Sequence, residues 1–164
     1  MEIEIFVKDR CFGDFIPRTY NTEEDDIRSI LVDVCRFIEH QVDFKVSGFG
    51  QDHWPVDTGT DLPVFLEQLP ATIKALEIRQ SANIDFYEQG IERYLKLDYS
   101  NINDFYEISC TSNTDWKPDP KIEKIHASEL IDIFSNIKRT FITIMTELSP
   151  TIIHHPWVTE WKNI

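Results

Sequence analysis

Apolar and polar positions recur with strand or helix spacing along most of the chain. They alternate over residues 2–7 and again over 42–47, which predicts two strands with one buried face each. Between them, apolar residues from Ile27 to Ile38 recur at offsets of three and four, and this spacing predicts a helix. Thr22, followed by four acidic residues, is its expected N-cap, and Gly48-Phe49-Gly50 is expected to end the second strand.

The second half of the chain repeats the same two patterns. A helix should begin after Thr60, with Pro63 in its first turn and Pro70 breaking or kinking it before a further turn or two. Residues 84–88 and 91–99 read as a hairpin around Gln89-Gly90, and 105–110 as the next strand of an antiparallel meander. Residues 113–121 read as an exposed connector. A long helix should run from Ser128 to about 149, and a tail with two tryptophans at helical spacing should dock on the domain.

The order of these elements, β-α-β-α-β-β-β-α, predicts the fold class. We expect one α+β domain over residues 1–164. It should contain a single mixed, mostly antiparallel five-stranded sheet and about three main helices. The outer face of the sheet should carry charged residues and tyrosines.

Composition and charge narrow the partners that such a domain can have. Of 164 residues, 41% are hydrophobic and 12% aromatic, enough for a packed core, yet the formal net charge is -13. Residues 1–115 hold 23 acidic and 10 basic side chains, whereas 116–164 hold 6 of each. This excess disfavours direct binding of nucleic acid or a membrane surface and favours a basic protein partner. The absence of a bilayer-length apolar run and the three scattered cysteines fit a cytoplasmic protein.

Signatures of common enzymes are missing from the sequence. Its glycines do not form a nucleotide-binding loop, and it has no serine elbow or H-E-x-x-H helix. We therefore expect no catalytic residue, metal ligand or cofactor. Two alternatives stay open: a small hydrolase or metal-dependent enzyme that uses the Asp52, His53 and Asp57 loop, and an acidic nucleic-acid mimic that sequesters DNA-binding proteins.

Three stretches together resemble a known family. They are Phe44-Lys45-Val46-Ser47-Gly48-Phe49-Gly50-Gln51-Asp52-His53-Trp54-Pro55-Val56-Asp57, then residues 60–70 (TDLPVFLEQLP), then residues 84–93 (IDFYEQGIER). The combination resembles bacterial immunity proteins of contact-dependent growth-inhibition and polymorphic toxin systems. The resemblance covers roughly residues 44–93. It implies a cytoplasmic, non-enzymatic protein that binds and neutralises the C-terminal toxin domain of a cognate effector, often a nuclease acting on transfer RNA or DNA.

Interface residues vary among such cognate pairs, so the matched stretches are read as framework and the contact surface is sought elsewhere. Carboxylates beside aromatic rings suit an arginine-rich cleft, although helix capping and sheet solvation would explain the same residues without a partner. The candidate toxin-binding residues are Glu23, Glu24, Asp25, Asp26, Glu88, Glu92, Tyr94, Asp98, Asp104, Tyr106 and Glu107.

Overall fold

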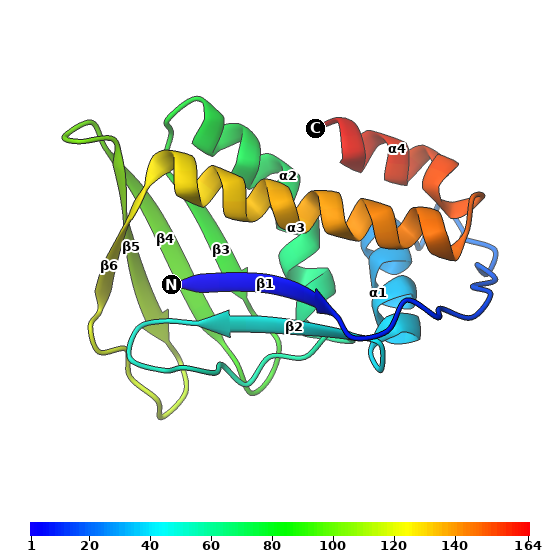
Figure 1. The fold of residues 1–164 in the computed structure, drawn as a ribbon, viewed down its shortest axis with the longest axis horizontal. Helices are drawn as coiled ribbons and strands as arrows, with labels where there is room; N and C mark the ends of the chain where they lie inside the picture. The colour runs from blue at the N-terminus through cyan, green and yellow to red at the C-terminus, as the bar shows by residue number, and fades with distance from the viewer.

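The computed structural model describes residues 1–164 as an α+β fold with four α-helices and two antiparallel sheets (Figure 1). The elements in chain order are β1 (Glu2–Val7), α1 (Ile27–Ile38), β2 (Val42–Ser47), α2 (Asp61–Glu77), β3 (Ala82–Phe86), β4 (Arg93–Ser100), β5 (Phe105–Ser112), β6 (Ile122–His126), α3 (Ala127–Leu148), a short 3-10 turn (Ile152–His154) and α4 (Pro156–Asn163). None of the helices is long and apolar enough to cross a membrane.

The strands form two sheets, so the prediction of one five-stranded sheet is wrong. β1 pairs only with β2, with Ile3 opposite Val46, and β3-β4-β5-β6 form a separate meander. The far edge of β2 is already occupied, because Trp54 N–H donates to the Val46 carbonyl at 2.9 Å and the Thr58 hydroxyl donates to the Val42 carbonyl at 2.8 Å. β2 therefore does not pair with the meander through this edge.

The sixth strand, β6, has no counterpart in the sequence pattern. Only Ile125 of its five residues is buried, so the strand lacks the run of alternating apolar positions by which the others are recognised. It pairs with β5 in register, Glu107 lying opposite Lys124. The connector before it is also less exposed than expected, because Trp116 packs against Trp54 with ring centroids 6.0 Å apart.

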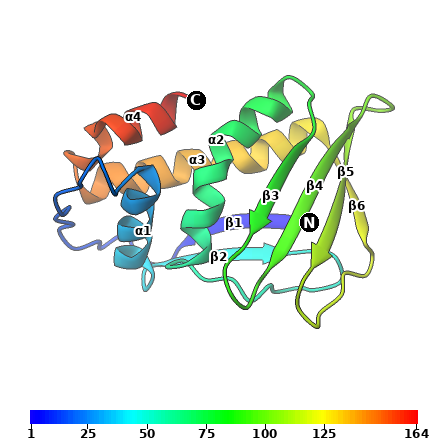
Figure 2. The same ribbon diagram turned by 180° about the vertical axis from the view of Figure 1, so that it is seen from behind.

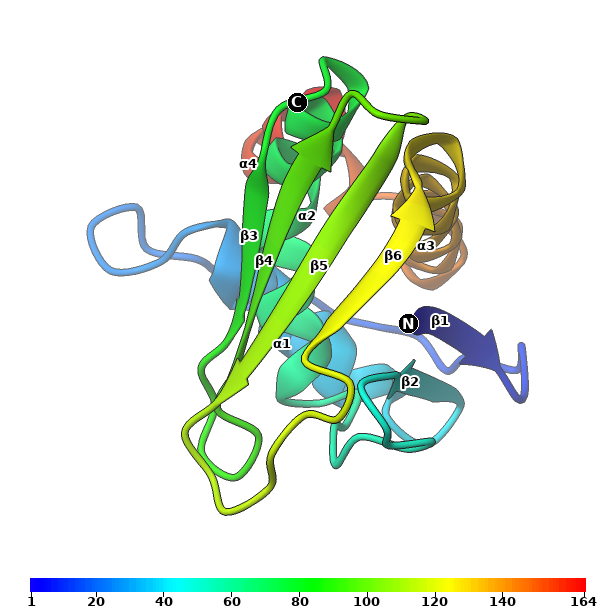
Figure 3. The same ribbon diagram turned by 90° about the vertical axis from the view of Figure 1, so that its left-hand side faces the viewer.

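Helices and the β1–β2 pair cover one face of the four-stranded sheet and leave the other face open (Figure 3). One apolar core lies between the layers. Phe65 of α2 stands at its centre, with ring centroids 5.6 Å from Phe44, 6.0 Å from Phe86 and 5.6 Å from Phe134. These four rings belong to β2, α2, β3 and α3, so the core joins elements from both sheets.

Two helices begin at other residues than the sequence suggested. α1 begins after Asp26, not Thr22: the Asp26 carboxylate accepts from the N–H groups of Arg28 at 2.8 Å and Ser29 at 3.4 Å. α3 begins after His126, whose Nδ1 accepts from the Ser128 N–H at 3.3 Å. The residue that accepts from the free first-turn amides lies four residues after the expected cap in α1 and two residues before it in α3.

Pro70 does not break α2, which is continuous over Asp61–Glu77, although Figure 2 shows its two halves running in different directions. Proline has no N–H, so the Leu66 carbonyl loses the hydrogen bond that residue 70 would donate. The indole Nε1 of Trp161 donates to that carbonyl at 2.8 Å instead. The expected docking of the tail is confirmed, since Trp161 of α4 is 3% exposed.

The β3–β4 turn is longer than predicted, because the strands stop at Phe86 and resume at Arg93. Gly90 has the expected positive φ of 102°, and Glu92 shares the left-handed region with a φ of 40°. The meander itself is confirmed.

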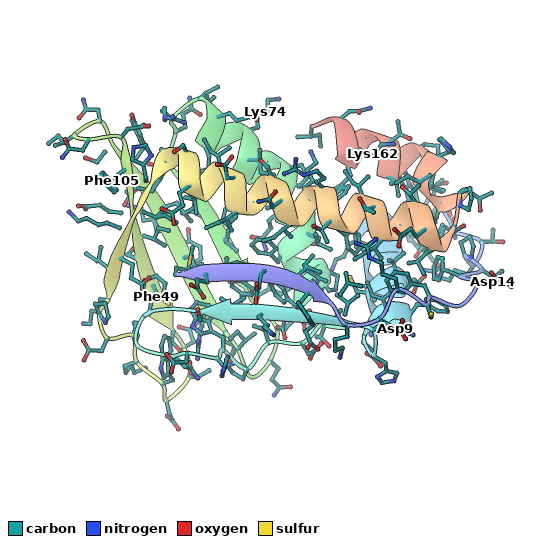
Figure 4. All side chains as sticks on the ribbon, viewed as in Figure 1. Asp9, Asp14, Phe49, Lys74, Phe105 and Lys162 are labelled. Carbon is teal, nitrogen blue, oxygen red and sulfur yellow. The ribbon has the colours of Figure 1, made fainter.

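The tight turn at residues 48–51, which follows β2, packs against the segment that precedes β6. Gly50 has a φ of 80°, and a Cβ there would lie 2.0 Å from the Asp119 carbonyl oxygen, so only glycine fits. The Glu123 carboxylate accepts from the Phe49 N–H and from the N-terminal ammonium of Met1. Phe49, labelled in Figure 4, thus lies where the two sheets are tied together.

Candidate partner-binding surface

In the predicted acidic cluster at residues 23–26, two carboxylates are hydrogen-bonded within the protein and two are not. Arg18 donates two hydrogen bonds to Asp25, at 2.6 and 2.9 Å, and this guanidinium holds the pKa of Asp25 well below its usual range. Asp26 caps α1 as described. Glu23 and Glu24 are exposed and form no ion pair, so both can offer their charge to a partner, and Asp26 keeps one carboxylate oxygen, Oδ2, without a hydrogen-bond partner.

Of the two acidic residues in the turn between β3 and β4, one forms an ion pair within the protein and the other does not. Glu88 Oε1 lies 3.1 Å from Arg28 Nη2, and Arg28 also approaches Glu67 Oε2 at 3.5 Å. The Tyr87 hydroxyl donates to Glu67 at 2.5 Å, which completes a network holding the turn against α1 and α2. Glu92 is exposed and forms no ion pair.

Charges on the open face of the four-stranded sheet are largely balanced. Asp98 lies 2.7 Å from Lys96, and Glu107 lies 2.6 Å from Lys124. Tyr94 is 38% exposed on this face. The open face therefore carries charged residues and a tyrosine as expected, but the pairing of its charges weakens it as a docking surface for a basic protein.

Asp104 and Tyr106 both have structural roles in this fold, and Tyr106 is too deeply buried to offer its side chain to a partner. Asp104 binds Arg79 through two hydrogen bonds, at 2.7 and 3.1 Å, and accepts from the Tyr99 hydroxyl at 3.0 Å. Tyr106 is fully buried, and its hydroxyl donates to the Gln80 carbonyl at 3.0 Å. The reason lies in the strand alternation, because Tyr106 shares the core side of β5 with Ile108 and Cys110.

The largest hollow in the surface lies beside β2, at the C-terminal end of α1. Its volume is about 530 Å³, and a smaller pocket of about 60 Å³ adjoins it over the outer faces of β1 and β2. Lys45 is the only lysine or arginine in the lining of either pocket. Six carboxylates line the two together, and we call this surface the acidic hollow: Glu2, Glu4, Glu39, Asp43, Asp52 and Asp57.

The local fold brings two of these carboxylates to one point. A Cβ on Gly59 would lie 2.5 Å from Glu39 Oε2 and 3.7 Å from Asp57 Oδ1, so the missing side chain of Gly59 leaves room for both. Asp57 accepts from the Thr60 N–H at 2.6 Å, and Glu39 Oε1 lies 3.8 Å from Nε2 of His40. Neither carboxylate has a lysine or arginine partner.

The remaining lining acids are only partly neutralised. Asp43 lies 2.8 Å from Lys8, and Glu4 lies 4.0 Å from Lys45, with all four side chains at least 40% exposed. Exposed pairs of this kind exchange readily for other partners. The acidic hollow thus presents more carboxylates than basic side chains, and these carboxylates can bind a positively charged surface.

The loop considered as a catalytic alternative forms part of this hollow. His53 and Asp57 line the larger pocket, and Asp52 lines the smaller one. No group of three or more His, Cys, Asp or Glu side chains is placed to hold a metal ion. Nearby Asp61 is 4% exposed, and burial raises its pKa to about 6, while its carboxylate accepts from the Asp57 N–H at 2.8 Å.

Sequence reasoning missed four members of the hollow: Glu2, Glu4, Glu39 and Asp43. A signal for three of them was present, because alternation placed Glu2, Glu4 and Asp43 on the polar side of the first two strands. Their meeting depends on the antiparallel pairing of β1 with β2, which sets Glu4 opposite Lys45 and thus beside Asp43. No local pattern contains that pairing.

Sequence reasoning also missed a buried cation next to the hollow. Arg93 is 2% exposed, and its guanidinium lies between two rings, 4.3 Å from the centroid of Trp54 and 3.6 Å from that of Trp116. Nη2 donates to Gln51 Oε1 at 2.7 Å, whereas Nε and Nη1 have no partner, and burial lowers the pKa of Arg93 to about 10. Gln51 and Trp54 belong to the stretch read as framework, and here they act as framework for Arg93.

Comparison of the chain with models of protein families, with curated proteins and with solved structures gave no match. Its surface chemistry is therefore the basis for a functional proposal.

Proposed function

We propose that the chain is an immunity protein that binds and neutralises the C-terminal toxin domain of a cognate contact-dependent growth-inhibition effector. The observation that carries the proposal is the acidic hollow, where six carboxylates share the lining with a single lysine. A basic protein surface is the partner that such a lining favours. The resemblance of residues 44–93 to immunity proteins supplies the biological setting.

The hollow suits inhibition of a nuclease for an electrostatic reason. A nuclease must attract phosphate groups, and arginine and lysine side chains in its cleft do so. Glu39 and Asp57 converge without a basic partner of their own, so they can accept hydrogen bonds from an inserted guanidinium or ammonium group. Once those cations are engaged, the substrate loses the charges that hold its backbone.

The direct test begins with the gene next to this protein's own, which we expect to encode an effector that ends in a toxin domain, and a neighbouring metabolic operon would count against the proposal. Both proteins would be purified, and binding would be measured by calorimetry and surface plasmon resonance over a series of salt concentrations, together with the activity of the toxin. We expect binding, loss of toxin activity, and association that slows as salt rises. A toxin domain that neither binds nor loses activity would overturn the proposal.

Three sets of substitutions locate the interface. The first neutralises free acids of the hollow, as Glu2→Gln, Glu39→Gln and Asp52→Asn. The second neutralises the free acids predicted from sequence, as Glu23→Gln, Glu24→Gln and Glu92→Gln. The third is a matched control on exposed helical positions, as Glu77→Gln, Glu129→Gln and Asp132→Asn.

We expect the first set to weaken binding by between about threefold and about 150-fold, because each of the three exposed charge pairs contributes about 0.2–1 kcal/mol. The second and third sets should leave affinity within about twofold. Equal losses for all three would contradict a defined interface and indicate attraction by net charge alone. Tight binding to unrelated basic proteins such as cytochrome c would favour the nucleic-acid mimic.

A further inference from the structure

A second concave site lies at the other end of α1, between α1, α2 and α4. Figure 2 shows α4 beside these two helices, and the groove between them has a volume of about 270 Å³. Its residues differ entirely from those of the acidic hollow, which lies near Glu39 at the C-terminal end of α1. A helix of this length separates the two sites by roughly 18 Å.

The lining of this groove, which we call the tryptophan groove, combines apolar surface with carboxylates. Its apolar members come from all three helices and the end of the chain: Ile27, Pro70, Ala71, Trp157, Trp161 and Ile164. Trp157 is half-buried and Ile164 is 50% exposed, so part of this apolar surface stays in contact with solvent. Trp161 is held against α2 by its hydrogen bond to the Leu66 carbonyl, so this side of the groove is fixed.

The charged members of the groove are all acidic. They are Asp26, Glu67 and Glu160, and no lysine or arginine lines it. Glu67 already binds Arg28 and Tyr87, and Asp26 uses Oδ1 to cap α1. Glu160 is exposed and forms no ion pair, and Asp26 Oδ2 has no hydrogen-bond partner, so two carboxylates can still accept from a ligand.

We propose that the tryptophan groove binds a short basic segment of a partner protein, with one apolar side chain in the groove and an adjacent arginine or lysine at Glu160 and Asp26. Charge complementarity favours this occupant, because an apolar ligand without a cation would make no ion pair with the carboxylates of the groove. Indole rings beside carboxylates also suit a guanidinium group, which can stack on the ring while donating to the oxygens.

The size of the groove favours a peptide segment. Its volume is just below the roughly 300 Å³ at which pockets begin to enclose a small-molecule ligand, and it is partly open to solvent. One side chain with its neighbours on either side fills such a site. The proposal rests on no part of the proposed toxin neutralisation, since the two sites share no residue.

Peptide titration followed by nuclear magnetic resonance tests the proposal. The probe is a capped peptide with Arg-Leu-Arg between glycine and serine residues, and the matched peptides carry Arg-Ser-Arg or Glu-Leu-Glu. The four indole N–H signals report the location, because Trp157 and Trp161 line the groove while Trp54 and Trp116 sandwich Arg93. We expect saturable shifts of the Trp157 signal with Arg-Leu-Arg, at least fivefold weaker binding of both matched peptides, and unchanged Trp54 and Trp116 signals.

Substitutions in the protein complete the test. Ala71→Arg places a cation in the groove at an exposed helical position and should abolish the shifts. Glu160→Gln should weaken binding about threefold, the effect of losing one exposed charge, whereas Asp132→Asn on α3 should not change it.

The absence of saturable shifts would overturn the proposal, as would equal binding of all three peptides or binding unaffected by Ala71→Arg. A concentration-dependent dimer abolished by Ala71→Arg would also overturn it and assign the groove to a second copy of the chain. Because the titration contains no toxin, its failure would leave the proposed function standing.

Discussion

The hydrogen bond between Trp161 and the Leu66 carbonyl makes a quantitative prediction about stability. Pro70 removes the amide that would serve this carbonyl within α2, and the indole of α4 replaces it at 2.8 Å in a site where Trp161 is 3% exposed. Trp161→Phe keeps an aromatic ring but removes the donor. The buried carbonyl then loses its partner, which costs about 1–3 kcal/mol, and the smaller ring adds a packing loss.

A second substitution separates the hydrogen bond from the packing. Pro70→Ala restores an N–H at the position from which a continuous helix donates to the Leu66 carbonyl. In that background, Trp161→Phe removes a donor that the helix can replace, so only the packing loss remains. We expect the cost of Trp161→Phe to be about 1–2 kcal/mol smaller in the Pro70→Ala background than in the parent chain.

Urea unfolding followed by far-ultraviolet circular dichroism measures all four proteins of this cycle without relying on tryptophan fluorescence. The quantity of interest is the difference between the two costs of Trp161→Phe. Independent sites add to within about 0.3–0.5 kcal/mol. A difference inside that range would refute the idea that the indole compensates for the proline, and Trp161 would then act through packing alone.

Three further predictions concern single sites. Gly50→Ala should lower the free energy of unfolding by more than about 2 kcal/mol in thermal or urea unfolding, because a Cβ meets the Asp119 carbonyl at a positive φ. Gly90 also has a positive φ, 102°, but no atom lies within 4 Å of its Cβ position, so Gly90→Ala should cost only the backbone strain of about 1–2 kcal/mol. Equal costs of the two substitutions would contradict the predicted clash at Gly50. Asp61 has a raised pKa of about 6, so its carboxyl group binds a proton more tightly in the folded state than in the unfolded state. The contribution of this group to stability should therefore fall as pH rises from about 4 to 6. Asp61→Asn should remove that part of the pH dependence measured by urea unfolding. Arg93→Lys should cost about 1–3 kcal/mol and weaken the near-ultraviolet circular dichroism of the tryptophans, because an ammonium cannot stack on two rings; an unchanged spectrum would contradict the sandwich.

Local pattern was sufficient to predict α1, α2, α3 and the first three strands of the meander, β3, β4 and β5. The apolar residues from Ile27 to Ile38 recur with helical spacing, and so do those along α3. Each helix could therefore be predicted without knowing which elements pack against it. The separation into two sheets could not be read in this way. It depends on Trp54 and Thr58 occupying the far edge of β2, which is a contact between a loop and a strand.

The same distinction applies to the candidate surface. Acidic residues are visible in a sequence, but their counter-ions are not: Asp25 is neutralised by Arg18 and Asp104 by Arg79, 25 residues away. Tyr106 shows a different failure, because its position in a correctly predicted strand already placed it beside Ile108 on the buried side. Applying the strand alternation to the choice of contact residues would have removed Tyr106.

The division into two sheets also sets an order in which the chain can fold. β3, β4, β5 and β6 are consecutive and pair with their nearest neighbours, so the meander closes only short loops. β1 must wait for β2, with α1 and a long loop between them, and α4 reaches back 95 residues from Trp161 to Leu66. We expect amide protection in pulsed hydrogen exchange to develop first in the meander and last in the β1–β2 pair, so the acidic hollow would be among the last surfaces to form on a newly made chain.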